Sequence, residues 1–177
     1  MGSMNSITVE QTREEMGLAF EVHRNADMCS IRLSRCKMAC QVPEESSSGS
    51  VVVDFAIKSQ RVPAPKGMLR VEVDFRMAGE SKSESATKRP AKRAPIVSVG
   101  CVYLVDYQLK EGFEPSPKQV KAFKDGNVIF NCWPYFREHL QESMQRMGFP
   151  PLTAPFLRVQ PKPSKASAAA NPKATQS

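Results

Sequence analysis

Residues 131–156 read NCWPYFREHLQESMQRMGFPPLTAPF and hold five aromatic side chains, in a chain of 177 residues that is only 7% aromatic. Their apolar positions are three or four residues apart, the spacing of one buried stripe on an α-helix: Trp133, Phe136, Leu140, Met144 and Met147. Pro134 is compatible with a helix that begins near residue 133, since a proline in the first turn removes no helical hydrogen bond. Gly148, followed by two prolines, predicts the end of the helix. We expect this stripe to lie mainly in the core or in a subunit interface.

The segment before this helix predicts a second, shorter helix. Ser116 is a good N-cap residue and Pro117 suits the first helical position. Val120 and Phe123 follow as an apolar i, i+3 pair. We expect Gly126 to end this helix as a C′ glycine.

Upstream of the helices, four segments have the alternation of β-strands: 31–42, 51–59, 69–77 and 96–109. In 31–42 the apolar positions change from odd to even, which predicts a β-bulge. Residues 96–109 are partly apolar on both faces, so we expect this strand to be covered on both sides. Residues 5–28 give only a weak strand signal, at Leu18, Phe20 and Val22. The sequence therefore predicts an α+β fold, a four-stranded antiparallel meander with two C-terminal helices packed on it.

The net charge of +7 is concentrated in two polar segments, because 79–95 and 160–177 each carry +3 and the remaining residues together only +1. We expect both segments to be disordered. A nucleic-acid groove needs its basic residues on ordered structure, so this distribution disfavours nucleic acid as a partner. A nucleic-acid-binding module that uses the basic loop and tail remains an alternative. The sequence has no membrane-spanning apolar run and no secretory signal, so we expect a cytoplasmic location.

The five cysteines, an odd number, predict reduced and buried thiols. Cys36 and Cys40 share a strand face but lack the C-x-x-C spacing of zinc or redox sites, so we predict no metal and no cofactor. Cys132 and His139 could share a helix face, but no third residue is evident to orient a catalytic pair. A glycine-rich phosphate loop is also absent from the sequence. We therefore expect a protein that is not an enzyme.

The C-terminal half contains a strand, a crossover segment and a helix with two sequence motifs, in that order. The long strand at 96–109 leads into a crossover segment at 111–130. A helix then opens with Pro-Tyr-x-Arg-Glu at 134–138 and closes into Gly-Phe-Pro-x-Leu and Ala-Pro at 148–155. These features, over roughly residues 96–159, resemble the SecB family of protein-export chaperones. The resemblance implies a SecB-like domain at 29–159. We expect residues 1–28 to be an N-terminal extension, whose opening Met-Gly-Ser-Met is typical of residues added in cloning.

The resemblance implies an ATP-independent chaperone, or holdase, that assembles as a dimer of dimers and holds unfolded polypeptides in apolar grooves for export. Methionine suits such grooves because it is flexible and polarizable, and the chain has nine. The implied groove residues lie in the crossover segment, the last helix and the segment after it: Phe113, Phe123, Phe130, Trp133, Phe136, Leu140, Met144, Phe149, Leu152, Phe156 and Leu157.

The resemblance also implies that an acidic sheet face contacts the SecA motor, and the candidates for it are Asp54, Glu72, Asp74 and Asp106. A solvated strand face is the simpler explanation of these acidic residues, since Lys58, Arg70 and Arg76 lie among them. The tail after residue 160 has no cysteine or histidine and so lacks the zinc-binding cluster of the family. A further alternative is therefore a SecB-like chaperone dedicated to a toxin–antitoxin pair.

Overall fold

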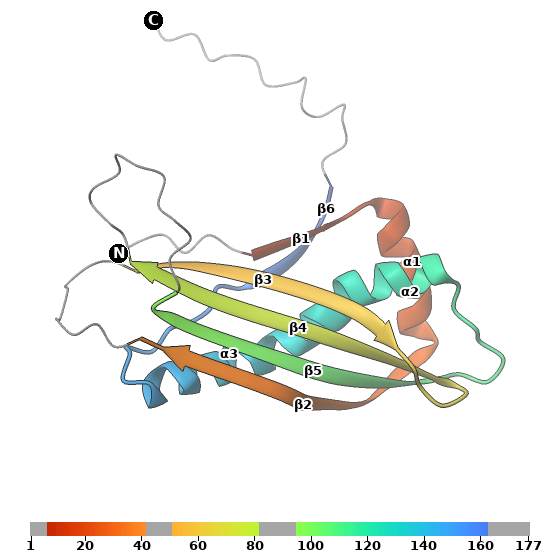
Figure 1. Ribbon diagram of the computed structural model, residues 1–177. Helices are drawn as coiled ribbons and strands as arrows, with labels where there is room; N and C mark the ends of the chain where they lie inside the picture. The colour runs from red at the N-terminus through yellow and green to blue at the C-terminus, as the bar shows by residue number, and fades with distance from the viewer. Residues whose placement is uncertain (1–6, 42–50, 82–94, 163–177) are drawn as a thin grey trace, which may run out of the picture.

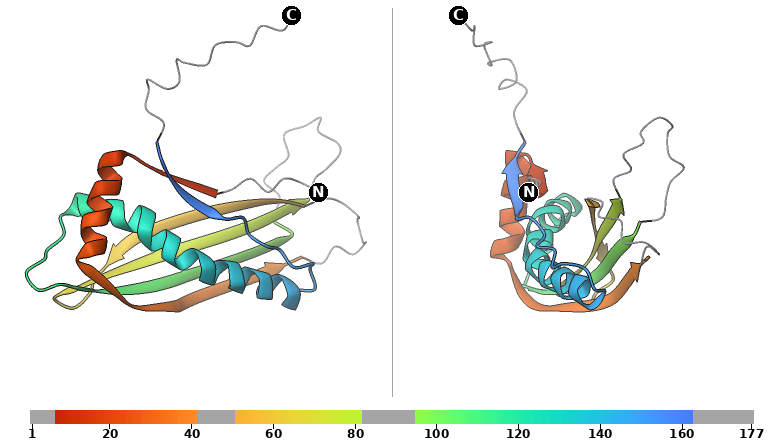
Figure 2. Two further views of the ribbon diagram at one scale, coloured as in Figure 1. Left: turned by 180° about the vertical axis from the view of Figure 1, so that it is seen from behind. Right: turned by 90° about the vertical axis from the view of Figure 1, so that its left-hand side faces the viewer.

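The computed structural model describes residues 7–41, 51–81 and 95–162. They form an α+β fold in which a four-stranded antiparallel sheet carries its helices on one face (Figure 1). The end-on view in Figure 2 shows the sheet curving around the long C-terminal helix. The predicted fold class is confirmed.

The main sheet consists of β2 (Ala26–Cys40), β3 (Val51–Val62), β4 (Met68–Ser81) and β5 (Val97–Leu109). Its order is β2-β5-β4-β3, so the expected meander is wrong for its first strand, because β2 pairs with β5 and not with β3. The reason lies in β5, whose second face is also covered: Val102 and Asp106 are 8% and 5% exposed. Such a strand belongs at the centre of a sheet, between two neighbours.

The predicted bulge in the first strand is confirmed. The register between β2 and β5 shifts between Leu33 and Arg35, where the apolar positions change parity. A second shift lies between Met28 and Ser30. An extra residue at each shift turns the following side chains to the other face.

The core lies between the sheet and the helices. On β4 the side chains of one face are 0–1% exposed: Leu69, Val71, Val73, Phe75 and Met77. The helical stripe packs against them, and the rings of Phe75 and Phe136 stack with centroids 4.9 Å apart. Trp133 also contacts both of these rings, and its indole Nε1–H donates to the Pro155 carbonyl at 3.0 Å. The stripe is thus core, as expected.

The C-terminal helices form one continuous run: α2 (Pro117–Phe123), a π-helical turn η1 (Lys124–Val128) and α3 (Ile129–Arg146). Ser116 caps α2 as predicted, accepting from the Gln119 N–H in a capping box. Pro134 therefore lies inside α3 and not in a first turn, so the expected helix start was wrong. Gly148, with φ of +78°, ends α3 as predicted, and the Phe149 N–H donates back to the Met144 carbonyl at 2.9 Å.

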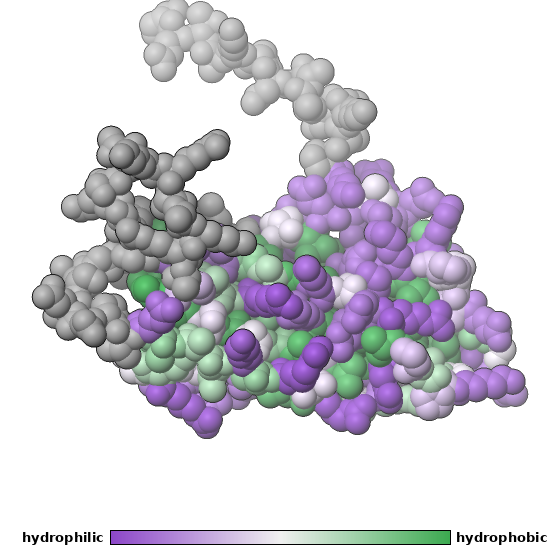
Figure 3. All heavy atoms as spheres, viewed as in Figure 1, coloured by the Kyte–Doolittle hydropathy of each residue, from purple (hydrophilic) through white to green (hydrophobic). Residues whose placement is uncertain are grey.

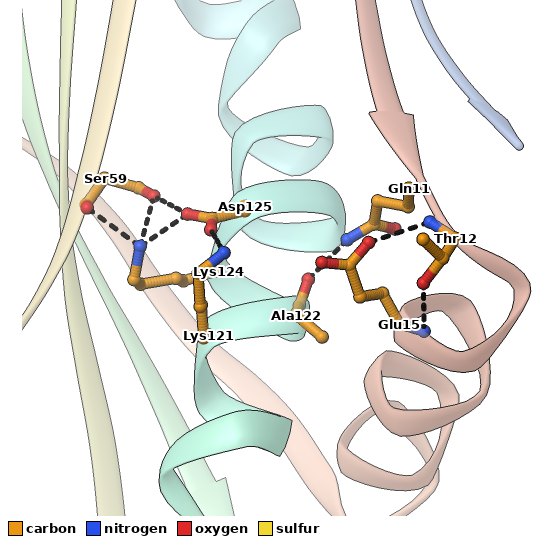
Figure 4. A network of polar contacts seen from close by, with 8 residues as sticks. All are labelled: Gln11, Thr12, Glu15, Ser59, Lys121, Ala122, Lys124 and Asp125. Atoms are coloured by element: carbon orange, nitrogen blue, oxygen red, sulfur yellow. Dashed lines mark hydrogen bonds and ion pairs between the residues drawn. The ribbon is translucent and has the colours of Figure 1, made fainter. Parts of the chain in front are cut away.

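The prediction that Gly126 ends a helix is wrong, because Gly126 is buried inside the π-helical turn. It accommodates a close neighbour: a Cβ atom there would lie 2.6 Å from Oε1 of Gln11. The Gln11 side chain is 4% exposed, and its Nε2 donates to the Ala122 carbonyl at 2.7 Å (Figure 4). The glycine is required for a long-range contact that spacing along the sequence does not reveal.

The N-terminal residues form β1 (Ile7–Gln11) and α1 (Arg13–Arg24), so the weak strand predicted around Phe20 is wrong. Thr12 begins the helix in a capping box with Glu15, in which the Glu15 N–H donates to Thr12 Oγ1 and the Thr12 N–H to the Glu15 carboxylate (Figure 4). Ala19 and Val22 are buried in the core. Residues 7–28, which we expected to precede the domain, therefore supply side chains that pack in or against its core.

A second, two-stranded sheet completes the fold. In it β1 pairs in parallel with β6 (Leu157–Pro161), which brings the two ends of the described chain together above α3 (Figure 2). None of the helices in the described ranges combines the length and apolar character that crossing a bilayer requires. The basic segment at 82–94 and the tail from 163 lie outside the described residues.

Candidate functional site

A groove runs between α1, the start of α3 and β6, on the side of the molecule away from the main sheet, and we call it the α1–β6 groove. Its volume is about 550 Å³. Its apolar lining comes from three elements that are far apart in the sequence: Met16, Ala19, Phe20, Phe130, Leu157 and Val159. Gln11, Asn127, Arg158 and Gln160 supply the polar part of the lining.

Two aromatic side chains stand largely in water at this groove. Phe20 is 57% exposed and Phe130 is 53% exposed, and Met16 beside them is 38% exposed. Each helix turns its neighbouring side chains inward, since Ala19 on α1 and Ile129 on α3 are buried. Single exposed apolar side chains are common, but a cluster of them around a concavity is typical of a binding surface.

The electrostatic environment of the groove is set by its rim. The Arg24 guanidinium lies 5.9 Å from the centroid of the Phe20 ring, and the His23 ring is 6.3 Å away. Glu15 is committed to the N-terminus of α1, where the hydrogen bonds from Thr12 lower its pKa. The groove therefore offers apolar area with a weakly polar margin and no convergent set of catalytic groups.

The groove residues predicted from sequence divide into four groups. Phe130 and Leu157 line the α1–β6 groove, although Leu157 itself is buried. Phe156 is 70% exposed under the Arg137 guanidinium, which is 4.7 Å from its ring centroid. Three more are half-buried against the core: Phe113, Phe149 and Leu152. The others are buried in the single chain and contribute almost no accessible surface: Phe123, Trp133, Phe136, Leu140 and Met144.

Sequence reasoning missed Met16 and Phe20, because it interpreted their segment as a possible strand. The signal that could have found them is the pattern T-R-E-E at 12–15, a capping box that predicts a helix from residue 13. With helical periodicity, Phe20 falls on a different face from the buried Ala19 and Val22.

A second groove, of about 700 Å³, lies between β1 and the edge strand β3. Ile7, Val9 and Ile57 line it together with polar groups of η1. There Asp125 accepts from Ser59 Oγ at 2.7 Å and pairs with Lys124 (Figure 4). Burial alone would raise the pKa of Asp125, but the hydrogen bonds from Lys124 and Ser59 hold it below its usual value. This network fastens η1 to β3 and leaves the groove more polar than the α1–β6 groove.

The outer face of the main sheet carries the four acidic candidates among other side chains. Hydrophilic and hydrophobic residues alternate over it (Figure 3). Asp106 is 5% exposed and accepts from Arg70 Nε at 2.5 Å and from Arg32 Nη2 at 2.8 Å. The Arg70 hydrogen bonds lower the pKa of Asp106.

Two of the other three acidic side chains also have partners. Asp74 accepts from Arg76 at 2.6 Å, and Glu72 accepts from Gln60 at 2.8 Å. Asp54 is exposed. Because arginines neutralise Asp74 and Asp106, the face carries less free negative charge than the acidic residues alone suggest.

The expectation of buried thiols holds for Cys101 and Cys132 but is wrong for Cys29, Cys36 and Cys40, which are exposed. Those three lie on β2, an edge strand that leaves most of its side chains in water. Burial raises the pKa of the Cys132 thiol to about 12. His139 does not pair with this thiol, because its Nε2 contacts Cys36 on β2 instead.

Comparison with solved structures gives a match over most of the chain. The Mycobacterium tuberculosis SecB-like chaperone Rv1957, solved in complex with a ChAD peptide from the HigA1 antitoxin Rv1956, aligns with a TM-score of 0.65 at 15% identity. The match covers 79% of this chain and 96% of that one. The chain has a SecB-like fold.

Sequence comparison does not reach this likeness. No protein-family model matches the chain, and no curated protein matches it significantly. A Streptococcus agalactiae protein of unknown function aligns with a TM-score of 0.43 at 10% identity, over 74% of this chain and 97% of that one.

Proposed function

We propose that this protein is an ATP-independent chaperone that binds unfolded polypeptide segments in the α1–β6 groove. The observation that carries the proposal is the pair of exposed rings, Phe20 and Phe130, on either side of a groove of about 550 Å³. An unfolded chain presents aromatic and aliphatic side chains in no fixed order. Its binder needs apolar area and adaptable side chains, and Met16 beside the two rings supplies the latter.

The SecB-like fold supports this proposal, because the neighbour of the same fold was solved with a bound antitoxin peptide. This observation favours a client of the toxin–antitoxin type over general export. Export through the SecA motor remains the second candidate, with Asp54 on the outer sheet face as its most exposed acidic contact. A catalytic role is not part of the proposal, since the groove offers no convergent set of catalytic groups.

Assembly into a homo-oligomer is part of the proposal, in the form of the dimer of dimers that the resemblance to the SecB family implies. The edge strand β2 supports it, because its apolar side chains Met28, Leu33 and Met38 are 50%, 45% and 42% exposed in the single chain. An unpaired edge with apolar side chains is a surface that proteins cover. Native mass spectrometry of the reduced full chain gives the subunit number directly.

Suppression of aggregation tests the chaperone proposal. A client unfolded in urea is diluted into buffer without nucleotide, and light scattering is followed at increasing ratios of the full chain. We expect scattering to fall at near-stoichiometric ratios. Replacing Phe20 and Phe130 by serine removes contacts of about 1–2 kcal/mol each, so we expect roughly 5–30-fold weaker protection per ring.

Tyr135 supplies the matched control, because it is 48% exposed on the same helix as Phe130 but does not line the groove. Tyr135→Ser is expected to protect the client like the unsubstituted chain. Equal loss in Tyr135→Ser, or full protection in the Phe20→Ser/Phe130→Ser variant, contradicts the assignment of the groove. Salt-dependent retention of RNA or DNA would instead favour the nucleic-acid alternative, whose basic segments lie mostly outside the described residues.

A further inference from the structure

Two thiols and an imidazole from distant parts of the chain meet where β2, β5 and α3 pack together. Cys36 and Cys101 are register partners across the antiparallel pair of β2 and β5. His139, on α3, places its Nε2 atom 3.0 Å from the Cys36 sulfur. One donor atom of each residue lies within 4.8 Å of the other two.

We propose that Cys36, Cys101 and His139 form a binding site for a thiophilic metal ion, Zn²⁺. Tetrahedral zinc holds sulfur at about 2.3 Å and nitrogen at about 2.0–2.1 Å, so its donor atoms lie roughly 3.5–3.8 Å apart. The Cys36 sulfur and the His139 Nε2 atom are 3.0 Å apart, and all three donor atoms lie within 4.8 Å of one another, so shifts of about an ångström bring them to this spacing. Cys36 is exposed and His139 half-buried, which leaves the fourth position open to water.

The chemistry of the three groups favours a metal over an accidental cluster. Cys101 is fully buried, so a thiolate there needs a positive charge beside it. A divalent cation supplies the positive charge that two thiolates need, and it takes the place of the protons on binding.

A disulfide between Cys36 and Cys101 is the competing use of the same sulfurs, since they face each other across two strands. It would leave the imidazole of His139 without a role, although its Nε2 is aimed at Cys36 at 3.0 Å. The donor set of two sulfurs and one nitrogen is the set that zinc prefers.

A metal bound at this site would stabilise the edge strand β2. Within the described residues, β2 has β5 as its one neighbour in the sheet, and its second half is exposed. A metal bound by Cys36 and His139 ties this half to α3, so zinc is expected to raise the melting temperature. The inference concerns a different part of the molecule from the α1–β6 groove and does not depend on the proposed function.

Titration with Co²⁺ tests the site on the full chain, reduced with a phosphine and stripped with a chelator. We expect one Co²⁺ per chain, a thiolate-to-cobalt charge-transfer band, visible bands of tetrahedral cobalt, and displacement by Zn²⁺. Cys36→Ser and His139→Gln change side chains that are not fully buried, so both variants are expected to fold. Each is expected to weaken binding by more than the roughly 10–100-fold that loss of an outer-shell partner causes.

Cys29→Ser and Cys40→Ser are the matched controls, because both residues are exposed cysteines on β2. They are expected to leave the cobalt spectrum and the zinc-induced rise in melting temperature unchanged. Absence of tetrahedral cobalt bands in the reduced protein would overturn the proposal. Full binding by His139→Gln would do so as well, as would a Cys36–Cys101 disulfide that persists under reductant and excludes the metal.

Discussion

Substitutions at Gly126 and Gln11 are predicted to have coupled effects on stability, and the structure gives the sign and the size of the coupling energy. In Gly126→Ala the new Cβ atom would lie 2.6 Å from Gln11 Oε1, closer than such atoms approach in proteins. Gln11 is 4% exposed, so it can move only by giving up its 2.7 Å hydrogen bond to the Ala122 carbonyl. Leaving a buried amide unpaired costs about 1–3 kcal/mol.

Alanine is also a better helix former than glycine by about 1 kcal/mol, which offsets part of this loss. We therefore expect Gly126→Ala to lower the free energy of unfolding by about 0–2 kcal/mol in the natural background. In a Gln11→Ala background the new Cβ atom has no side chain to clash with, and Gly126→Ala is expected to raise the free energy of unfolding by about 1 kcal/mol. The coupling energy of the double-mutant cycle is thus about 1–3 kcal/mol.

Urea unfolding measures the four chains of this cycle. The single tryptophan, Trp133, is 4% exposed in the core, so its fluorescence reports the loss of the packing between helix and sheet. The slope of free energy against urea should be the same for all four chains. If Gly126→Ala changes stability equally in both backgrounds, within about 0.5 kcal/mol, the explanation of the glycine by its contact with Gln11 is wrong.

Three further outcomes follow from burial and charge. Phe136→Ala should lower the free energy of unfolding by about 3–5 kcal/mol, because the ring is fully buried. Tyr135→Ala, on the exposed side of α3, should change the free energy of unfolding by no more than about 0.5 kcal/mol, and urea unfolding measures both variants. Asp106→Asn should cost about 1–3 kcal/mol at neutral pH, since Arg70 and Arg32 lose a charged partner, and the exposed Asp54→Asn should cost about 0.5 kcal/mol or less. The folded-state pKa of Asp106 is lowered, so its stabilising contribution is present above the unfolded value of about 3.9 and is lost as the pH falls through the folded pKa. In unfolding curves, the stability difference between the unsubstituted chain and Asp106→Asn should therefore persist at pH 7 and vanish in acid. A stability difference that grows on acidification would contradict the ion pair.

The periodic parts of the sequence predicted the fold well, because each strand and the long helix bury one face. The alternation around Phe75 and the stripe around Phe136 gave both the elements and the core. The parity change in the first strand gave its bulge. These signals are local, so one segment carries each of them in full.

The errors arose where a distant contact decides the structure. Gly126 has the sequence context of a helix end, but the Gln11 side chain, from the other end of the chain, makes it an interior residue. The neighbour of β2 could not be read from its own alternation, which is compatible with pairing on either side. Without α1, the groove beside Phe20 could not be anticipated, although Phe130 on its other side was predicted.

A photo-crosslinking amino acid placed at residue 130 tests the central claim most directly. The same group at residue 135 is the control, since Phe130 and Tyr135 are similarly exposed on α3 and only the first lines the α1–β6 groove. On illumination with an unfolded client, residue 130 is predicted to crosslink strongly and residue 135 weakly. Equal crosslinking at the two positions, or crosslinking at residue 135 alone, would show that the client binds elsewhere.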